Sequence, residues 1–274
     1  MSAVATATIG SLLLESGLPR AEAQLLVRIL LGCERAWLIA HAEETVEPSR
    51  RLAAQDWFSR RRAGEPIAYI TGEREFFGLA LRVTPEVLIP RPETELLVEL
   101  ALGRIPPGGA VLDLGTGSGA VALALAHGRP GLQVTATEVS ESALAIAREN
   151  ARRHELAIDF VPGDWFEALG PGLFDLIVSN PPYVASHDPH LEQGDLRFEP
   201  RLALAGGEGG MQCIRHIAAG ARARIRPGGW LLFEHGCDQS ARCMALLGGL
   251  GYVEVEDFRD LAGLPRVCAG RCPG

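Results

Sequence analysis

The first part of the chain has the hydrophobic spacing of helices. Up to about residue 70, apolar residues recur at intervals of three and four, which is typical of amphipathic helices. The stretch LPRAEAQLLVRILLGCERAWLIAH shows this spacing most clearly. We expect its apolar stripe to consist of Leu25, Ile29, Leu30, Leu38 and Ile39.

The pattern changes between these helices and residue 110. AYITGEREFFGLALRVTP carries β-type residues on both sides of Gly78, which predicts a hairpin. VLIPRPETELLVELAL predicts a proline-rich turn that enters a helix, with Thr94 and Glu95 in the first turns.

From residue 110, short apolar strands alternate with helical stretches. The strands are AVLDLG, LQVTATE, IDFVPGD, FDLIVSN and WLLFEHG, and ESALAIARENARRHE is one of the helices between them. This alternation predicts an α/β fold with a parallel sheet covered by helices on both faces. YVEVEDF and RVCAGR add two strands that suit an antiparallel edge. We therefore divide the chain into helices (1–72), a β-hairpin linker (73–90) and an α/β domain (91–274).

Composition describes a globular protein. Hydrophobic residues make up 47% of 274 residues, and no apolar run reaches the roughly 18 residues of a membrane span. The N-terminus lacks a basic start followed by a long apolar stretch, so no signal peptide is expected. The six cysteines form no C-x-x-C pair and no metal-ligand pattern, which predicts packing roles in a reducing, cytoplasmic setting, with exposure expected only for Cys268 and Cys272.

Charge limits the possible partners. The net charge of −8 argues against a protein that coats nucleic acid. One basic stretch, SRRLAAQDWFSRRRAG (49–64), has five arginines. A solvated helix face is the favoured interpretation, and contact with RNA or an RNA-bound partner is the alternative. The chain has no lysine, which excludes a P-loop and a lysine Schiff base.

VLDLGTGSGAVALALA (111–126) reads as strand, glycine turn and helix. Gly115, Gly117 and Gly119 permit a tight turn that brings the backbone close to a ligand at the helix N-terminus. The ligand is expected beyond the carboxyl ends of the strands. With Ala120, the same glycines also fit a dinucleotide fingerprint. Glu138 ends the next strand, where its carboxylate can accept both hydroxyls of an adenosine ribose.

Three further residues belong to this interpretation. Asp164 follows the third strand and can accept a hydrogen bond from an adenine amino group. Trp165 can lie against the adenine ring, and the alternative is an aromatic at the rim of the core. Asp113 is expected to support the glycine turn.

FDLIVSNPPYVAS (174–186) carries the most specific chemistry. The side-chain carbonyl of Asn180 and the backbone carbonyl of Pro181 can accept the two hydrogens of a substrate –NH2. Because Pro182 follows, Pro181 is biased toward an extended conformation that holds its carbonyl still. Tyr183 can cover a planar group by stacking. Such a site aligns a weakly nucleophilic amide nitrogen with an activated methyl group, without a metal or a covalent nucleophile.

Together these motifs resemble an S-adenosylmethionine-dependent N-methyltransferase. GEPIAYITGEREFFGL, LIPRPETE, SHDPHLEQGDLRFEP and LLFEHG extend the resemblance to the HemK/PrmC family from about residue 64 to the C-terminus. That family methylates the N5 amide nitrogen of the glutamine in the Gly-Gly-Gln motif of peptide-chain release factors. Asn-Pro-Pro-Tyr alone also occurs in DNA adenine methyltransferases.

The resemblance implies an architecture and a set of partners. The fold would be Rossmann-like, with a mostly parallel seven-stranded sheet, an antiparallel edge and a small helical N-terminal substrate-recognition domain. S-adenosyl-L-methionine would be the cofactor and release factors the protein substrate. We expect a cytoplasmic monomer in translation termination, with no direct contact to nucleic acid and no membrane.

The resemblance also implies roles for individual residues. The methionine part of the cofactor would lie against Gly115, Thr116, Gly117, Ser118 and Gly119. Glu138, where Asp is more usual, would bind the ribose, and Trp165 the adenine region. The glutamine amide would be bound by Asn180, Pro181, Pro182 and Tyr183, with Asn180 and Pro181 as catalytic groups and Asn180 also near the cofactor. Arg197 and Glu199 are polar candidates in the loop that shapes the protein-substrate site.

Three other functions remain as alternatives. A nucleic-acid amino methyltransferase of the adenine N6 type shares the motif, but it calls for an added DNA-recognition domain and a basic face. A nicotinamide-dependent reductase shares the glycine turn but gives Asn-Pro-Pro-Tyr no purpose, and its common Tyr-x-x-x-Lys pair needs a lysine. A non-catalytic binding protein would have no need for the acceptors at Asn180.

Overall fold

The chain forms two units. A computed structural model describes residues 7–274 and divides into residues 1–72 and 73–274. Residues 1–6, on which the expectation about a signal peptide partly rests, lie outside the described residues. No helix within residues 7–274 is both long and apolar enough to cross a membrane.

The first unit is helical, as expected. Its helices are α1 (Ile9–Glu15), α2 (Arg20–Leu31), α3 (Arg35–Ala40), α4 (Pro48–Arg62) and α5 (Ile67–Thr71). A capping box starts α1, since the Thr8 hydroxyl accepts the Ser11 N–H and the Ser11 hydroxyl accepts the Thr8 N–H.

The predicted apolar stripe is only partly right. Its exposed members are Leu25 (38%), Ile29 (45%) and Ile39 (53%). Leu38 is buried as expected, but α2 buries Leu26 and Val27 against the rest of the unit. Because α2 has apolar residues on two adjacent faces, spacing alone fits a stripe through Leu25 and one through Leu26. Packing of α2 against α1 and α4 buries the stripe through Leu26.

The arginines of α4 form contacts within the first unit. Arg60 pairs with Glu65 at 2.6 Å and Arg61 with Glu22 at 2.7 Å. Arg62 donates to the Ser16 carbonyl at 2.5 Å. These three of the five arginines in the basic stretch therefore bind groups of the first unit itself.

The second unit begins with the hairpin expected around Gly78. β1 (Glu73–Phe76) and β2 (Leu79–Arg82) pair antiparallel across Phe77 and Gly78, which both have positive φ. A two-residue turn of this kind matches the twist of the two strands.

A seven-stranded sheet follows. Its strands are β3 (Ala110–Leu114), β4 (Gln133–Glu138), β5 (Asp159–Pro162), β6 (Phe174–Ser179), β7 (Ile225–Glu234), β8 (Val253–Arg259) and β9 (Pro265–Arg271), in the order β5-β4-β3-β6-β7-β9-β8. The strands from β5 to β7 in this order are parallel, whereas β9 runs antiparallel to β7 and β8. The predicted fold class is confirmed.

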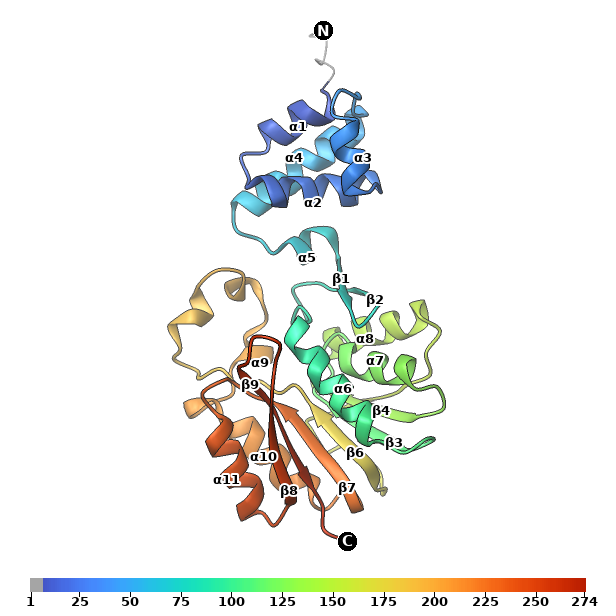
Figure 1. The fold of residues 1–274 in the computed structure, drawn as a ribbon, viewed down its shortest axis with the longest axis vertical. Helices are drawn as coiled ribbons and strands as arrows, with labels where there is room; N and C mark the ends of the chain where they lie inside the picture. The colour runs from blue at the N-terminus through green and yellow to red at the C-terminus, as the bar shows by residue number, and fades with distance from the viewer. Residues whose placement is uncertain (1–6) are drawn as a thin grey trace. The chain divides into compact units, whose positions relative to one another are not determined.

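Helices cover both faces of this sheet. The helical segments are η1 (Pro92–Thr94), α6 (Glu95–Arg104), α7 (Ala120–Gly128), α8 (Glu141–Arg153), η2 (Pro189–Glu192), η3 (Leu196–Phe198), α9 (Arg201–Leu204), η4 (Glu208–Gly210), α10 (Gln212–Ala221) and α11 (Ser240–Gly249). Figure 1 shows α6, α7 and α8 on one face and α10 and α11 on the other.

Alternating side chains of the strands build two cores. Val111 and Leu176 pack with α6 and α7, whereas Leu112 and Ile177 pack with α10 and α11. Because the central strands are parallel and buried on both faces, their carboxyl ends meet at one edge of the sheet. The glycine turn, Glu138 and Asn180 all follow strands at this edge.

Three of the six cysteines, Cys243, Cys268 and Cys272, are buried. All six are free thiols. The expectation that Cys268 and Cys272 are exposed is wrong, because Cys268 lies in β9 between two other strands and both side chains join the core under α10 and α11. Cys237 is the exposed one.

Candidate active site

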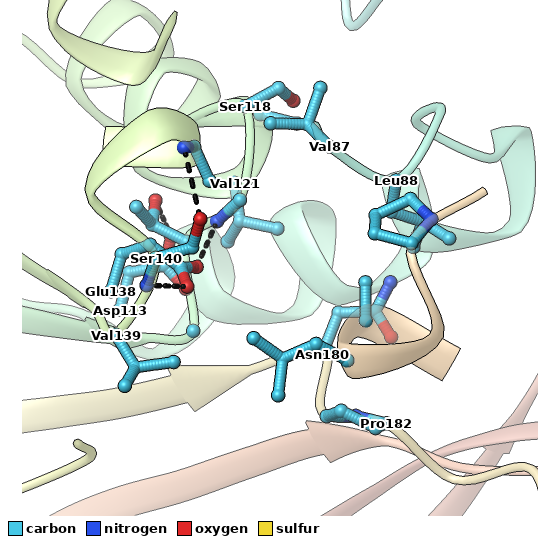
Figure 2. Close-up of a pocket in the computed structure, with 18 of the residues that line it drawn as sticks. Val87, Leu88, Asp113, Ser118, Val121, Glu138, Val139, Ser140, Asn180 and Pro182 are labelled. Atoms are coloured by element: carbon cyan, nitrogen blue, oxygen red, sulfur yellow. Dashed lines mark hydrogen bonds between the residues drawn. The ribbon is translucent and has the colours of Figure 1, made fainter. Parts of the chain in front are cut away.

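A cavity of about 500 Å³ lies at the carboxyl ends of β3, β4 and β6. Its lining includes the predicted site residues Gly115, Thr116, Gly117, Ser118, Glu138, Asp164, Trp165, Asn180 and Pro182. Three other predicted residues, Gly119, Pro181 and Tyr183, do not line it. Figure 2 shows Glu138 and Ser140 on one side of the cavity and Asn180 on another. We call residues 113–118 with 138–140 the glycine wall, and Thr94, Asn180 and Pro182 the Asn180 wall.

The glycine turn is fixed to the neighbouring strand. The N–H groups of Gly115 and Thr116 both donate to the Thr137 carbonyl at 3.0 Å. Gly119 has a φ of 86°, and a Cβ added there would collide with Leu123. Glycine is therefore required where the turn becomes α7.

Glu138 is oriented by the backbone. Its Oε2 accepts the Gly117 N–H at 2.9 Å, and its Oε1 accepts the Ser140 N–H at 3.0 Å. The residue is 9% exposed and lines the cavity. Since each carboxylate oxygen has two lone pairs, each keeps capacity for one further donor.

Asp113 supports the turn, as expected, and also reaches the cavity. It accepts a hydrogen bond of 2.6 Å from the Thr116 hydroxyl. Burial raises the pKa of Asp113 to about 7, and the nearby charge of Glu138 adds to the increase, while the Thr116 bond opposes it. The glycine wall thus holds one oriented carboxylate and one that gains a proton near neutral pH.

Trp165 lies between the cavity and the core, and its contact with an adenine ring stays a prediction. It lines the cavity and also packs against the core cluster under α10. Its φ of 45° is unusual for a bulky residue, and a Cβ at Gly115 would lie only 3.2 Å from its ring. Asp164 also lines the cavity. Burial raises the pKa of the Cys213 thiol, and the charge of Asp164 adds to the increase.

The Asn180 wall has two unused acceptors. The Asn180 Nδ2 donates to the Thr94 hydroxyl at 3.2 Å. Within residues 7–274, no hydrogen bond is made to Asn180 Oδ1 or to the Pro181 carbonyl, although Pro181 itself is buried. Asn180 lines the cavity, so its Oδ1 is available to a donor from a ligand, and the Pro181 carbonyl is a second acceptor without a partner, between the lining residues Asn180 and Pro182 in the chain.

Tyr183 does not line the cavity, and its hydroxyl is bonded to a buried carboxylate. The hydroxyl donates to Glu234 Oε1 at 3.0 Å, and burial raises the pKa of Tyr183. Its carbonyl accepts from Gln239 Nε2 at 2.9 Å. The predicted stacking of its ring on a substrate stays a prediction.

Close backbone contacts hold this segment in place. Val184 donates to the Leu204 carbonyl at 3.0 Å and accepts from Gly206 at 2.8 Å. A Cβ at Gly206 would collide with the Pro182 carbonyl, so only glycine permits this approach.

The loop before α9 reaches the proline-rich segment through Glu199. Its buried carboxylate accepts the Ile89 N–H at 3.1 Å and pairs with Arg91. Burial raises the pKa of Glu199, and Arg91 opposes that increase. Arg197 instead lies over the ring of Phe198, 4.9 Å from its centre, and does not line the cavity.

Several lining residues were not predicted individually. They include Glu86, Val87, Leu88, Pro90, Thr94, Val121, Ser140, Leu202, Ala203 and Cys213. LIPRPETE was recognised as a motif, but its contacts depend on pairing with segments about 90 to 140 residues away, which spacing does not give. No cluster of three or more His, Cys, Asp or Glu side chains suited to a metal ion occurs in residues 7–274.

Comparison with known proteins identifies relatives over nearly the whole chain. Family models for the methyltransferase small domain and the PrmC N-terminal domain match residues 92–195 and 5–72. The release factor glutamine methyltransferase of Bordetella pertussis is 52% identical over 94% of this chain and 97% of its own length. The enzyme of that name from Burkholderia pseudomallei is 50% identical over 98% and 97%.

A solved structure shares the fold. A methyltransferase from Pyrococcus furiosus superposes with a TM-score of 0.57 at 22% identity, covering 79% of this chain and 98% of that one. The methyl donor implied is S-adenosylmethionine. With half of its residues identical to named relatives over nearly its whole length, this chain belongs to the release factor glutamine methyltransferase family.

Proposed function

We propose that this protein methylates the N5 amide nitrogen of the glutamine in the Gly-Gly-Gln motif of peptide-chain release factors. The observation that carries the proposal is the unused Asn180 Oδ1 in the lining of the cavity that the glycine turn also lines, followed in the chain by the Pro181 carbonyl, which has no partner within residues 7–274 either. Relatives with about 50% identity carry the name of this activity.

The two acceptors suit a primary amide. Asn180 and Pro181 would each accept one N–H of the glutamine amide, which fixes the plane of the group and stabilises positive charge as it develops on nitrogen. Pro182 lines the cavity beside them, and Tyr183 would cover the amide. S-adenosylmethionine, when bound, supplies the methyl group as an electrophile.

The glycine wall has the features that this cofactor needs. The turn of residues 115–119 would lie against its methionine part, and the remaining lone pairs of Glu138 would accept the ribose hydroxyls. Asp164 and Trp165 would bind the adenine, since both line the cavity next to Gly115. Glu199 would shape the protein-substrate side, because it joins the 187–201 loop to Arg91.

We assign substrate recognition to residues 1–72, a linker role to residues 73–90 and methyl transfer to residues 91–274. In support, the first unit exposes apolar side chains such as Leu14 (88%) and Leu52 (67%), which a protein partner could cover. Its paired arginines give no support to direct nucleic-acid binding. Because release factors act on the ribosome, the site of action would be the cytoplasm, and one chain suffices for the reaction.

The test uses purified protein, labelled S-adenosylmethionine and a folded release factor. The release factor is supplied with its Gly-Gly-Gln glutamine intact or replaced by alanine, and mass spectrometry locates any added methyl. A methyl on that glutamine, absent from the alanine version, is the expected result. Transfer to nucleic-acid amino groups instead would overturn the proposal.

A further inference from the structure

A hydrogen-bond chain lies behind the Asn180 wall. The Asn180 Nδ2 donates to Thr94 Oγ1 at 3.2 Å, and Thr94 Oγ1 donates to Glu234 Oε2 at 2.6 Å. Thr94 is 3% exposed and Glu234 is 1% exposed, so water does not compete at these atoms. We call Glu234, Thr94 and Asn180 the Glu234 chain.

With Glu234 ionised, the direction of these bonds follows from the number of hydrogens. A hydroxyl has one hydrogen, and Thr94 gives it to the carboxylate. Thr94 can then only accept from Asn180, so the group that faces it must be the NH2. The carbonyl oxygen of Asn180 is left on the other side of the amide, where it has no partner within the described part of the chain.

We infer that Glu234 is a positioning residue that, through Thr94, turns the Asn180 amide so that its oxygen rather than its NH2 is presented to the substrate nitrogen. This inference rests on the proposed function. If the amide were reversed, its NH2 would meet the NH2 of the glutamine, and two donors would face each other. An asparagine in the correct place would then fail to bind the substrate amide.

The ionised state of Glu234 is essential to this arrangement. A protonated Glu234 could donate to Thr94, which would free the Thr94 hydrogen to donate to the Asn180 oxygen and reverse the amide. Burial raises the pKa of Glu234, and the nearby Glu93 adds to the increase. The Thr94 and Tyr183 hydroxyls and the charge of Arg266 oppose it by stabilising the carboxylate.

The first test substitutes Thr94 in the full-length enzyme. Thr94→Val keeps the shape but removes the hydroxyl, and Thr94→Ser keeps the hydroxyl. We expect Thr94→Val to lower kcat for glutamine methylation about ten- to hundredfold and Thr94→Ser to restore it to within about twofold, as for loss and recovery of alignment at the reacting group. The dissociation constant of S-adenosylmethionine, measured by calorimetry, should stay the same in both.

Thr137→Val is the matched control. Thr137 is also buried, but among the described residues its hydroxyl has no hydrogen-bond partner. The same substitution there should leave kcat unchanged. If Thr94→Val keeps the wild-type kcat, or if Thr94→Ser is as impaired as Thr94→Val, the inference is wrong.

The pH profile separates positioning from general structure. In the wild type, kcat should fall on the acid side as Glu234 gains a proton. In Glu234→Gln, which has no such proton to gain, kcat should be low and this acid limb should be missing. An unchanged acid limb in Glu234→Gln would contradict the role given to Glu234.

A third measurement does not depend on the substrate. In ¹⁵N-labelled protein, the side-chain amide signals of Asn180, identified by their loss in Asn180→Ala, should exchange with solvent faster in Thr94→Val than in the wild type. Equal exchange rates would show that Thr94 does not hold the amide. A wild-type enzyme that fails to methylate glutamine would overturn the proposed function, whereas this readout would still test the Glu234 chain.

Discussion

The two walls of the cavity are assembled in different ways. On the glycine wall, hydrogen bonds join residues close in sequence, with Thr116 and Asp113 three positions apart and Gly117 and Glu138 twenty-one. On the Asn180 wall, Asn180 and Thr94 are 86 positions apart, and Thr94 and Glu234 are 140. One βαβ unit therefore builds the first wall, whereas the second requires η1, β6 and β7 to come together.

Because different elements build the two walls, we expect a substitution on one wall to leave the function of the other wall intact. A change on the Asn180 wall should affect turnover and leave the cofactor bound. A change on the glycine wall should affect cofactor affinity or local stability and leave the alignment of the amide intact.

The largest effect is expected at Asn180. Asn180→Ala removes the acceptor for the substrate amide and should lower kcat by about a hundred- to a thousandfold, or about 3 to 4 kcal/mol, by analogy with the loss of one preorganised group around a transition state. Cofactor binding by calorimetry should be nearly unchanged. A variant with normal turnover would remove the argument for amide binding, and one that no longer binds cofactor would show that the walls are coupled.

A smaller effect is expected on the pH dependence of stability, through the carboxyl group of Asp113. Its pKa is 3.8 in the unfolded chain and about 7 in the folded protein, so folding favours the protonated form. The contribution of Asp113 to stability is fully present below pH 3.8 and is lost as the pH rises through 7. From pH 5 to 7 the wild type should lose about 2 kcal/mol of unfolding free energy through this group.

Asp113→Asn should remove that part of the pH dependence, because its amide oxygen can still accept from Thr116 without carrying a charge. Denaturant unfolding of both proteins at pH 5, 6 and 7 measures the difference. If the unfolding free energies of the two proteins change equally with pH, the assignment of the raised pKa to Asp113 is contradicted.

Glu138 should affect binding more than turnover. Glu138→Ala removes the acceptor proposed for the ribose and also leaves the Gly117 and Ser140 N–H groups without their carboxylate. We expect the dissociation constant of S-adenosylmethionine to rise about tenfold to a hundredfold, as for the loss of hydrogen bonds to a charged group. At saturating cofactor, kcat should be close to that of the wild type. Unchanged binding by calorimetry would refute the ribose assignment.

The smallest expected effect is on the free energy of unfolding, for the same substitution at two positions. Thr137→Val in β4 removes a buried hydroxyl that makes no hydrogen bond within residues 7–274 and should raise the unfolding free energy by about 1 kcal/mol. Thr94→Val on the Asn180 wall leaves Glu234 Oε2 and Asn180 Nδ2 without a partner and should lower the unfolding free energy. Thermal or denaturant unfolding of the two variants measures both signs. A loss of stability in Thr137→Val would mean that its hydroxyl has a partner, such as water.

The sequence by itself determined the parts of this protein that depend on neighbouring residues. Strand and helix periods predicted the α/β sheet, and the glycines at 115, 117 and 119 predicted the turn that lines the cavity. The hairpin around Gly78 could be predicted for the same reason, because a turn depends on the φ angles of a few successive residues. Asn180 could be identified as a candidate site residue because the end of its strand and the two prolines that follow are contiguous in the sequence.

Only the tertiary structure decided which side chains meet across the sheet. Spacing allowed two stripes on α2, and packing buried Leu26 and Val27 instead of Leu25 and Ile29. The burial of Cys268 depends on strands on both sides of β9. Thr94 and Glu234 meet because η1 and β7 lie at the same edge of the sheet, and no local pattern encodes a hydrogen bond over 140 residues. Such contacts require η1, β6 and β7 to be in their native positions. The orientation of the Asn180 amide therefore depends on the tertiary structure.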